Sequence, residues 1–143
     1  MRTLHFGLRV ADLDRSLAFY TAVGYEIVGS VPQTGIGYLT MLRLPGDEFV
    51  TIELVHSPGK TAVDSTAVGG GNGLSHFVIH VGSMDVALAE LAACGIDAEA
   101  PTSPDGSADF QTTWIVDPDG NRIELVQWPA GHADGITAAD WTE

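Results

Sequence analysis

The sequence predicts an α+β fold made of two copies of one βαβββ module. The first observation is an internal repeat: moving the chain by 71 positions places His5-Phe6 on His76-Phe77, and Ile-Glu-Leu-Val occurs at both 52–55 and 123–126. The second is the alternation of apolar and polar residues in several short runs of each copy, as in half-buried strands. The third is one helix-like run per copy, which starts after an acidic or hydroxyl residue and stops at a glycine. A repeat of this length indicates a duplicated structural module.

The first copy begins with a strand at residues 3–10, because its even-numbered residues are all apolar and would share one face. A helix follows through residues 13–20, for which Asp12 or Asp14 can serve as the N-cap and Gly24 as the C-terminal stop. The remaining hydrophobic runs of this copy predict three more strands, at residues 25–28, 38–44 and 50–55.

The second copy repeats this order. A strand at residues 75–81 precedes a helix that Ser83 can cap and Gly95 can end. We expect its further strands at residues 96–99, 111–116 and 121–126. The resulting domain organisation is a first module at residues 1–56, a glycine-rich linker at 57–73, a second module at 74–128 and a C-terminal tail at 129–143.

The composition of the chain limits the classes of molecule that it can bind. The chain has 143 residues, enough for one domain or for two half-domains that share a core. Its net charge of −13 argues against nucleic acid and anionic membranes, because both attract positive surfaces. No apolar run approaches the length of a membrane span, and the single cysteine, Cys94, excludes an intrachain disulfide and a thiolate metal cluster. We therefore expect a cytoplasmic protein that acts on a small molecule.

Each copy carries one histidine and one glutamate at equivalent positions. His5 and Glu53 are 48 positions apart, and so are His76 and Glu124. All four fall on the polar phase of a strand, so two related half-sheets would bring them together as a cup. Two imidazoles and two carboxylates suit a divalent metal such as zinc, nickel, cobalt, iron or manganese. A single strand histidine is usually structural, but the repeat relates both pairs at once, and this favours a metal site.

Two segments resemble a known protein family. They are the opening residues 4–20, Leu-His-Phe-Gly-Leu-Arg-Val-Ala-Asp-Leu-Asp-Arg-Ser-Leu-Ala-Phe-Tyr, and the closing residues 117–125, Asp-Pro-Asp-Gly-Asn-Arg-Ile-Glu-Leu. Over nearly all of residues 1–128 the chain resembles the vicinal oxygen chelate superfamily of glyoxalases, bleomycin-resistance proteins and extradiol dioxygenases. The resemblance implies two βαβββ modules that form a cup-shaped sheet around one metal site. The order His, Glu, His, Glu is similar to that of the glyoxalase I (lactoylglutathione lyase) branch.

Resemblance to that branch implies a metal-dependent lyase or isomerase. Its reaction would convert a hemithioacetal, made from a 2-oxoaldehyde and a thiol, into a 2-hydroxyacyl thioester through an enediolate-like intermediate. One divalent metal, zinc or nickel first and cobalt, manganese or iron next, would be held by His5, Glu53, His76 and Glu124. Glu124 would be the principal base, and Glu53 would serve the opposite face. Arg9 matches the arginine that grips the carboxylate of the thiol cosubstrate, and we expect a homodimer.

Some features depart from glyoxalase I. That enzyme has an asparagine shortly after its first glutamate ligand, which helps to hold glutathione, whereas His56-Ser57-Pro58 follow Glu53 here. Residues 104–110 are acidic and lack the lysine of a Lys-Gly-Gly stretch. Arg9 has an alternative role as a rim arginine paired with an acid. We therefore expect intact metal chemistry with most of the glutathione clamp absent, and a different thiol or none.

Two other functions stay open. One is a metal-free protein of the bleomycin-resistance type, which would sequester a hydrophobic drug or metabolite in a cup lined by Tyr38, Phe110 and Trp114. The other, less favoured, is an extradiol dioxygenase, because a second glutamate would fill a position that oxygen chemistry needs open. The sequence also leaves open whether each cup forms within one chain or between exchanged halves of a dimer.

Overall fold

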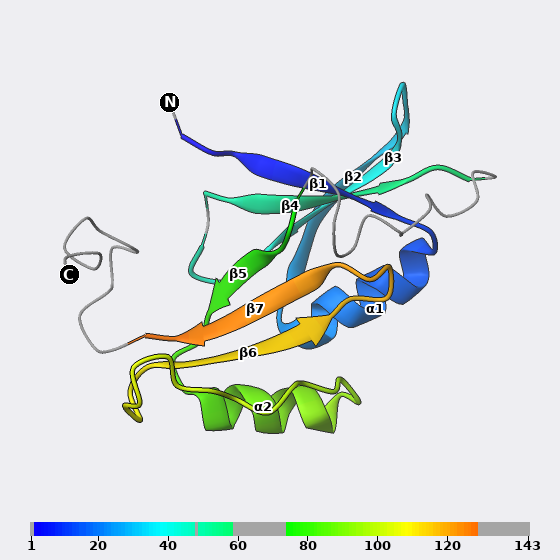
Figure 1. The fold of residues 1–143 in the computed structure, drawn as a ribbon. Coiled ribbons are helices and arrows are strands. Elements are labelled where there is room, and N and C mark those ends of the chain that lie inside the picture. Colours follow the sequence, from blue (N-terminus) through cyan, green and yellow to red (C-terminus); the bar gives the residue numbers. More distant parts are fainter. Residues whose placement is uncertain (1, 48, 59–73, 129–143) are drawn as a thin grey trace. The chain divides into compact units, whose positions relative to one another are not determined.

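The computed structural model describes residues 2–47, 49–58 and 74–128, and it confirms the α+β class (Figure 1). The described elements, in chain order, are β1 (His5–Val10), α1 (Leu13–Val23), β2 (Glu26–Thr34), β3 (Gly37–Arg43), β4 (Thr51–His56), β5 (Phe77–His80), α2 (Met84–Ala93), β6 (Gln111–Val116) and β7 (Arg122–Gln127). Most of the expected linker and all of the expected tail lie outside the described residues. Neither described helix is long and apolar enough to cross a membrane.

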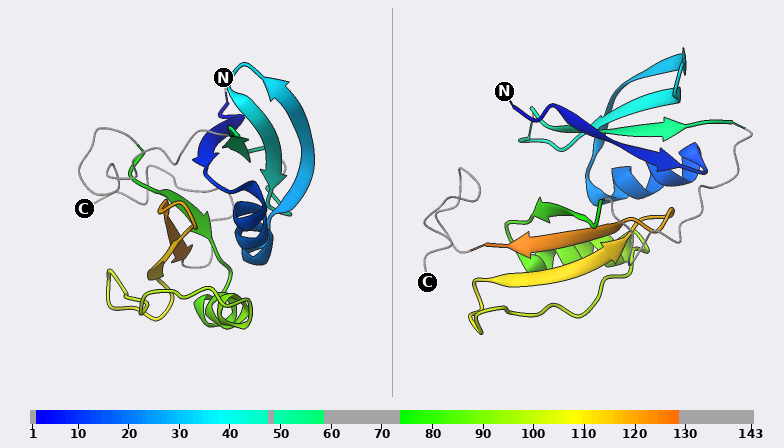
Figure 2. Two further views of the ribbon diagram at one scale, coloured as in Figure 1. Left: turned by 90° about the vertical axis from the view of Figure 1, so that its right-hand side faces the viewer. Right: turned by 45° about the horizontal axis from the view of Figure 1, so that its top comes forward.

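The chain divides into two units, each with its own sheet. Unit 1 runs up to Ser75 and also takes Val116–Asn121, whereas unit 2 holds His76–Ile115 and continues from Arg122. Unit 1 has a four-stranded sheet and unit 2 a three-stranded one. The sequence repeat is thus visible as two sheets, each accompanied by one helix (Figure 2).

The sheet of unit 1 has the strand order β1-β4-β3-β2. Strand β1 runs parallel to β4, and the other two pairs are antiparallel. Leu8 lies opposite Leu54, and Ile52 lies opposite Leu42. All four side chains are buried, so the apolar phase of these strands forms the core of the unit, as the alternation predicts.

Strand β2 is longer than the sequence suggested. Gly29 and Pro32 interrupt its apolar pattern, which is why a strand at only 25–28 was expected, yet the strand continues to Thr34. Its register against β3 shifts after Ile27 and again after Val31. Because β2 is at the edge of the sheet, a proline and irregular pairing are tolerated there.

Helix α1 has the ends that its sequence dictates. The Asp12 side chain accepts a hydrogen bond from the Arg15 backbone N–H, so Asp12 is the N-cap and Asp14 lies in the first turn. Gly24 ends the helix with φ at 118°, in the left-handed region that favours glycine, and its N–H donates to carbonyls of the last turn. Tyr20 is fully buried on this helix and meets Tyr25 edge to face, with ring centroids 5.7 Å apart.

The turn at residues 117–121 belongs to unit 1, although the strands on either side of it belong to unit 2. The buried Asp117 carboxylate accepts hydrogen bonds from the Tyr20 hydroxyl at 2.6 Å and from the Asp119 and Asn121 backbones. The Asp119 carboxylate accepts from the Ala11 N–H and the Ser16 hydroxyl. These contacts fix the turn that precedes β7 to α1 and to the residue Ala11 just before that helix.

The sheet of unit 2 has the strand order β5-β7-β6, with β5 parallel to β7. Ser83 caps α2 as expected, and the Met84 N–H donates to the Gln127 side chain at the end of β7. The apolar phase of the strands is buried together with two residues of α2. These core residues are Ile79, Met84, Leu91, Ile115, Ile123 and Leu125.

The strand expected at residues 96–99 is absent from the described structure. Three of its four residues, Asp97, Ala98 and Glu99, have weak strand propensity, and Pro101 follows shortly after it. It still runs beside β6, because the Glu99 N–H donates to the Trp114 carbonyl at 2.9 Å and Thr102 forms a bridge with Thr112. The segment therefore lies along β6 through isolated backbone contacts instead of a continuous strand pairing.

Candidate active site

Unit 2 brings His76 and Glu124 together. Strand β5 is parallel to β7 and Val78 lies opposite Glu124, so the residue two positions earlier, His76, falls on the same face of the sheet. The His76 Nε2 atom is 3.5 Å from the Glu124 Oε2 atom. The two side chains are 34% and 20% exposed, so both remain accessible to a ligand. This half of the expected quartet is a close pair.

Unit 1 places its corresponding pair on one face as well. Strand β1 is parallel to β4, with Gly7 opposite Glu53 and His5 opposite Thr51. A Cβ atom added at Gly7 would lie 3.4 Å from the Glu53 Oε2 atom, so the carboxylate extends over the glycine. Since His5 and Gly7 are two positions apart on the strand, His5 and Glu53 share this face.

Arg9 lies on the same phase of β1 as His5 and Gly7, and it is exposed. Among the described residues it forms no hydrogen bond or ion pair. The alternative of a rim arginine paired with an acid finds no partner in that part of the chain.

The donor chemistry of these pairs fits a divalent metal. Zinc–nitrogen and zinc–oxygen bonds of about 2.0 to 2.2 Å, meeting at a tetrahedral angle, place the two donor atoms about 3.4 Å apart. The separation of the His76 and Glu124 donor atoms, 3.5 Å, agrees with that value. Within the described ranges no three or more His, Cys, Asp and Glu side chains gather at one point. What each unit shows is a pair.

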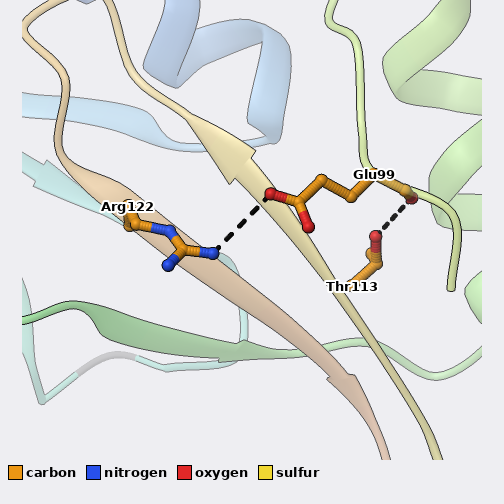
Figure 3. Close-up of polar contacts among 3 residues, drawn as sticks. All are labelled: Glu99, Thr113 and Arg122. Atoms are coloured by element: carbon orange, nitrogen blue, oxygen red, sulfur yellow. Dashed lines mark hydrogen bonds and ion pairs between the residues drawn. The ribbon is translucent and has the colours of Figure 1, made fainter. Parts of the chain in front are cut away.

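Three residues outside the expected quartet, Trp114, Arg122 and Glu99, form a connected set that reaches His76 through Trp114. The Trp114 ring meets the His76 ring at 79°, with centroids 5.0 Å apart. The Arg122 guanidinium lies over Trp114, 4.1 Å from its centroid, and forms an ion pair with Glu99 at 3.6 Å (Figure 3). Arg122 is two positions from Glu124, so strand alternation could have placed it on the site face; nothing in the sequence signals Glu99.

The loop before β6 is built by its own polar side chains. Asp105 accepts hydrogen bonds from the Ser107 backbone and the Ser103 hydroxyl, and the bond from Ser107 is the main reason why the pKa of Asp105 lies below its usual value. The Gln127 side chain donates to the Ala108 and Asp109 carbonyls. An acidic loop is thus fixed to the end of the strand that carries Glu124.

The family and relatives of the chain agree with this geometry. Residues 2–125 match the family model of the Glyoxalase/Bleomycin resistance protein/Dioxygenase superfamily. A protein of Vibrio parahaemolyticus named "Probable lactoylglutathione lyase" is 32% identical over 129 residues, which cover 88% of this chain and 90% of the relative. The lactoylglutathione lyase of Salmonella typhimurium is 31% identical over 130 residues, covering 89% and 93%.

A solved structure shows the same likeness in three dimensions. The E144Q mutant of glyoxalase I from Zea mays superimposes with a TM-score of 0.73 at 25% identity. The similarity covers 90% of this chain and 46% of the maize chain. The match to the family model, the two related sheets and the repeated His and Glu pairs all lead to one conclusion: the chain belongs to the Glyoxalase/Bleomycin resistance protein/Dioxygenase superfamily.

Proposed function

We propose that this protein is a metal-dependent, glyoxalase-type lyase or isomerase that acts on a hemithioacetal or another small molecule with two vicinal oxygens. The observation that carries the proposal is the His76–Glu124 pair, whose donor atoms are 3.5 Å apart on an accessible sheet face. The repeat supplies an equivalent pair, His5 and Glu53, on one face in unit 1. Relatives about 31% identical that are named lactoylglutathione lyase support the reaction type.

The four residues that would hold the metal are His5, Glu53, His76 and Glu124. Zinc and nickel are the first choices, and cobalt, manganese and iron also suit a nitrogen and oxygen donor set without thiolate. When bound, such an ion supplies Lewis acidity that stabilises negative charge on two adjacent substrate oxygens. One pair comes from each copy of the repeat, either within one chain or between the two chains of a homodimer.

Glu124 is the proposed principal base. Its carboxylate would take the proton from the hydroxyl-bearing carbon of the hemithioacetal and return it to the neighbouring carbonyl carbon. One C–H bond breaks and one forms, so the product is an isomer and no oxidant or reductant is consumed. The intermediate is enediolate-like. Glu53 would serve the opposite face of the substrate.

The thiol portion of the substrate is proposed to be less anionic than glutathione. Arg9 is a cation on the His5 face of β1, and the loop at residues 104–110 carries Asp105 and Asp109. Both carboxylates are ionised at neutral pH, so this loop is negative there. A dianionic peptide thiol would therefore meet repulsion that one arginine has to offset.

The proposal is tested by metal analysis of protein purified without chelator. We expect about one divalent ion per chain in the wild type, and a large loss in His76→Ala, because a site short of one ligand rarely keeps its affinity. His80→Ala is the matched control, since His80 is an exposed histidine of β5 outside the quartet, and it should retain the ion. Stoichiometric metal in His76→Ala would contradict the quartet. If the protein binds a small molecule equally well with and without a chelator and catalyses no reaction, it would instead be a metal-free sequestering protein.

A further inference from the structure

We propose that Trp114, held by Arg122 and Glu99, is a positioning residue that fixes the orientation of the His76 imidazole. The inference rests on the proposed function only where His76 is treated as a metal ligand; the ring arrangement itself is independent of any metal. His76 comes directly before β5 and its side chain is 34% exposed, so the strand alone does not determine its rotamer.

Two contacts of the His76 ring bear on its orientation. Its Nε2 atom is 3.5 Å from the Glu124 carboxylate. The Trp114 ring meets it at 79° with a centroid distance of 5.0 Å. Near-perpendicular rings at this distance attract through their quadrupoles, and the attraction depends on the angle between them. Trp114 therefore constrains the plane of the imidazole as well as its position.

Trp114 is itself held by a cation. The Arg122 guanidinium lies 4.1 Å from the Trp114 ring centroid, a distance typical of a cation–π interaction. The same guanidinium forms an ion pair with Glu99 at 3.6 Å. Exposed ion pairs contribute little to the free energy of unfolding. In the proposed arrangement the pair favours the rotamer of Arg122 that covers the tryptophan.

Glu99 is well anchored for that purpose. Its backbone N–H donates to the Trp114 carbonyl at 2.9 Å, and its carbonyl accepts from the hydroxyl of the buried Thr113 at 2.6 Å. Figure 3 shows the Thr113 hydroxyl directed at the Glu99 backbone while the Glu99 carboxylate reaches the other way to Arg122. The backbone that carries the carboxylate is thus tied to the strand that carries the tryptophan. Contacts thus connect Glu99 to Arg122, Arg122 to Trp114, and Trp114 to His76.

The consequence is a preorganised donor. Residues that orient a metal-ligating histidine typically account for about tenfold to a hundredfold in metal affinity. Removing Trp114 leaves the Glu124 contact but takes away the edge-to-face contact that constrains the plane of the imidazole.

The direct test is proton NMR of the metal-free protein. In the wild type, the ring current of Trp114 shifts the carbon-bound His76 ring protons away from the values of a solvent-exposed histidine; His76→Gln assigns these signals. In Trp114→Leu the shift should disappear, and in Trp114→Phe, which keeps a perpendicular ring, most of it should remain. Unchanged His76 signals in Trp114→Leu would overturn the inference.

Metal affinity, measured by competition with a chelator, is the second readout. Trp114→Leu should weaken Zn²⁺ or Ni²⁺ binding about tenfold, and Trp114→Phe should restore most of it. If the wild-type signals depend on Trp114 but no metal binds, the positioning holds and the proposed function fails. If metal binds equally well to wild type and folded Trp114→Leu, the inference fails and the proposed function stands.

The chain offers a matched control for the ion pair. Glu99 pairs with Arg122 at 3.6 Å and is 62% exposed, and Glu26 pairs with Arg43 at 3.7 Å and is 60% exposed. Glu99→Gln should broaden or shift the His76 signals and weaken metal binding, whereas Glu26→Gln should leave both unchanged. Equal effects of the two substitutions would overturn the inference. The two glutamate variants can still test the inference if Trp114→Leu does not fold, because neither glutamate is buried.

Discussion

The Tyr20 hydroxyl donates a hydrogen bond of 2.6 Å to the Asp117 carboxylate, which joins helix α1 to the turn before β7 across 97 positions of sequence. Both groups are buried. The first prediction is therefore that Tyr20→Phe lowers the free energy of unfolding by about 1.5 to 3 kcal/mol, the usual contribution of a hydrogen bond to a carboxylate. Urea denaturation measures it.

The control for that substitution is Tyr25→Phe. Tyr25 is also buried and packs against Tyr20, but its hydroxyl does not reach Asp117. We expect a loss of less than about 1 kcal/mol there. Similar losses in the two variants would show that the contact with Asp117 contributes nothing specific.

The second prediction concerns alkaline pH. Burial, and then the Asp47 carboxylate, raise the pKa of Tyr25 to about 12, and burial together with Asp117 raises that of Tyr20 further. An unfolded tyrosine ionises near pH 10, so above that pH the folded state holds more protons than the unfolded state. The stabilising effect of Tyr25 is complete below pH 10 and is lost as pH rises toward about 12, and that of Tyr20 is lost over a range that extends to higher pH.

Urea denaturation at pH values from about 9 to about 11 checks this dependence. The free energy of unfolding should fall steadily with pH in the wild type and less steeply in Tyr25→Phe, which lacks one of the two groups. An equal slope in both proteins would mean that Tyr25 ionises normally in the folded state.

The third prediction uses the close approach of Glu53 to Gly7. A Cβ at Gly7 would lie 3.4 Å from the Glu53 carboxylate, an ordinary van der Waals contact, so Gly7→Ala should be tolerated. Gly7→Val adds two methyl groups that must displace the carboxylate, although valine suits a strand. We expect about tenfold weaker metal binding in Gly7→Val, with the melting temperature near that of Gly7→Ala. Equal affinities would show that Glu53 is not a ligand.

The fourth prediction separates ligand from base. Glu124→Gln keeps an oxygen donor near His76 but cannot accept a proton at neutral pH, so turnover should fall by on the order of a hundredfold or more. Metal content should fall less than turnover. Glu53→Gln is the parallel variant, and undiminished turnover in Glu124→Gln would assign the base to Glu53.

The fifth prediction concerns the thiol. The hemithioacetal of methylglyoxal with glutathione should be a poor substrate, with a KM above about 1 mM, the upper end of the usual range. A hemithioacetal with an uncharged thiol should have a lower KM. The difference in KM between the two adducts should shrink at higher salt, because salt screens the negative charge of the protein. Steady-state kinetics of metal-loaded protein with both adducts measures it. A kcat/KM near about 10⁶ M⁻¹s⁻¹ with the glutathione adduct would contradict the prediction.

Sequence reasoning succeeded where the physics is local. The helix ends at Asp12, Gly24 and Ser83 were predictable because a cap acts on groups within a few residues of itself. The pairs on one strand face followed from the period of two. The strand expected at 96–99 was wrong because the repeat was extended to a segment whose own residues have weak strand propensity and precede Pro101.

Long-range contacts were beyond the sequence. The residues Asp117 to Gly120 have the composition of a turn, but nothing in them indicates that Tyr20 and Ser16 will bind their side chains. Likewise, Trp114 was expected only as a wall of a cup, whereas its ring contacts His76 and Arg122. Such contacts depend on tertiary packing that brings distant segments together.

The assignment of Val116–Asn121 to unit 1 also bears on how a duplicated gene became one protein. The second copy sends its hairpin turn into the first copy, where Tyr20, Ser16 and Ala11 supply the donors for two carboxylates. A fragment made of residues 74–128 alone would keep Asp117 and Asp119 but lose those donors. The second copy of the repeat is thus not self-contained, because donors that its turn carboxylates use come from the first copy.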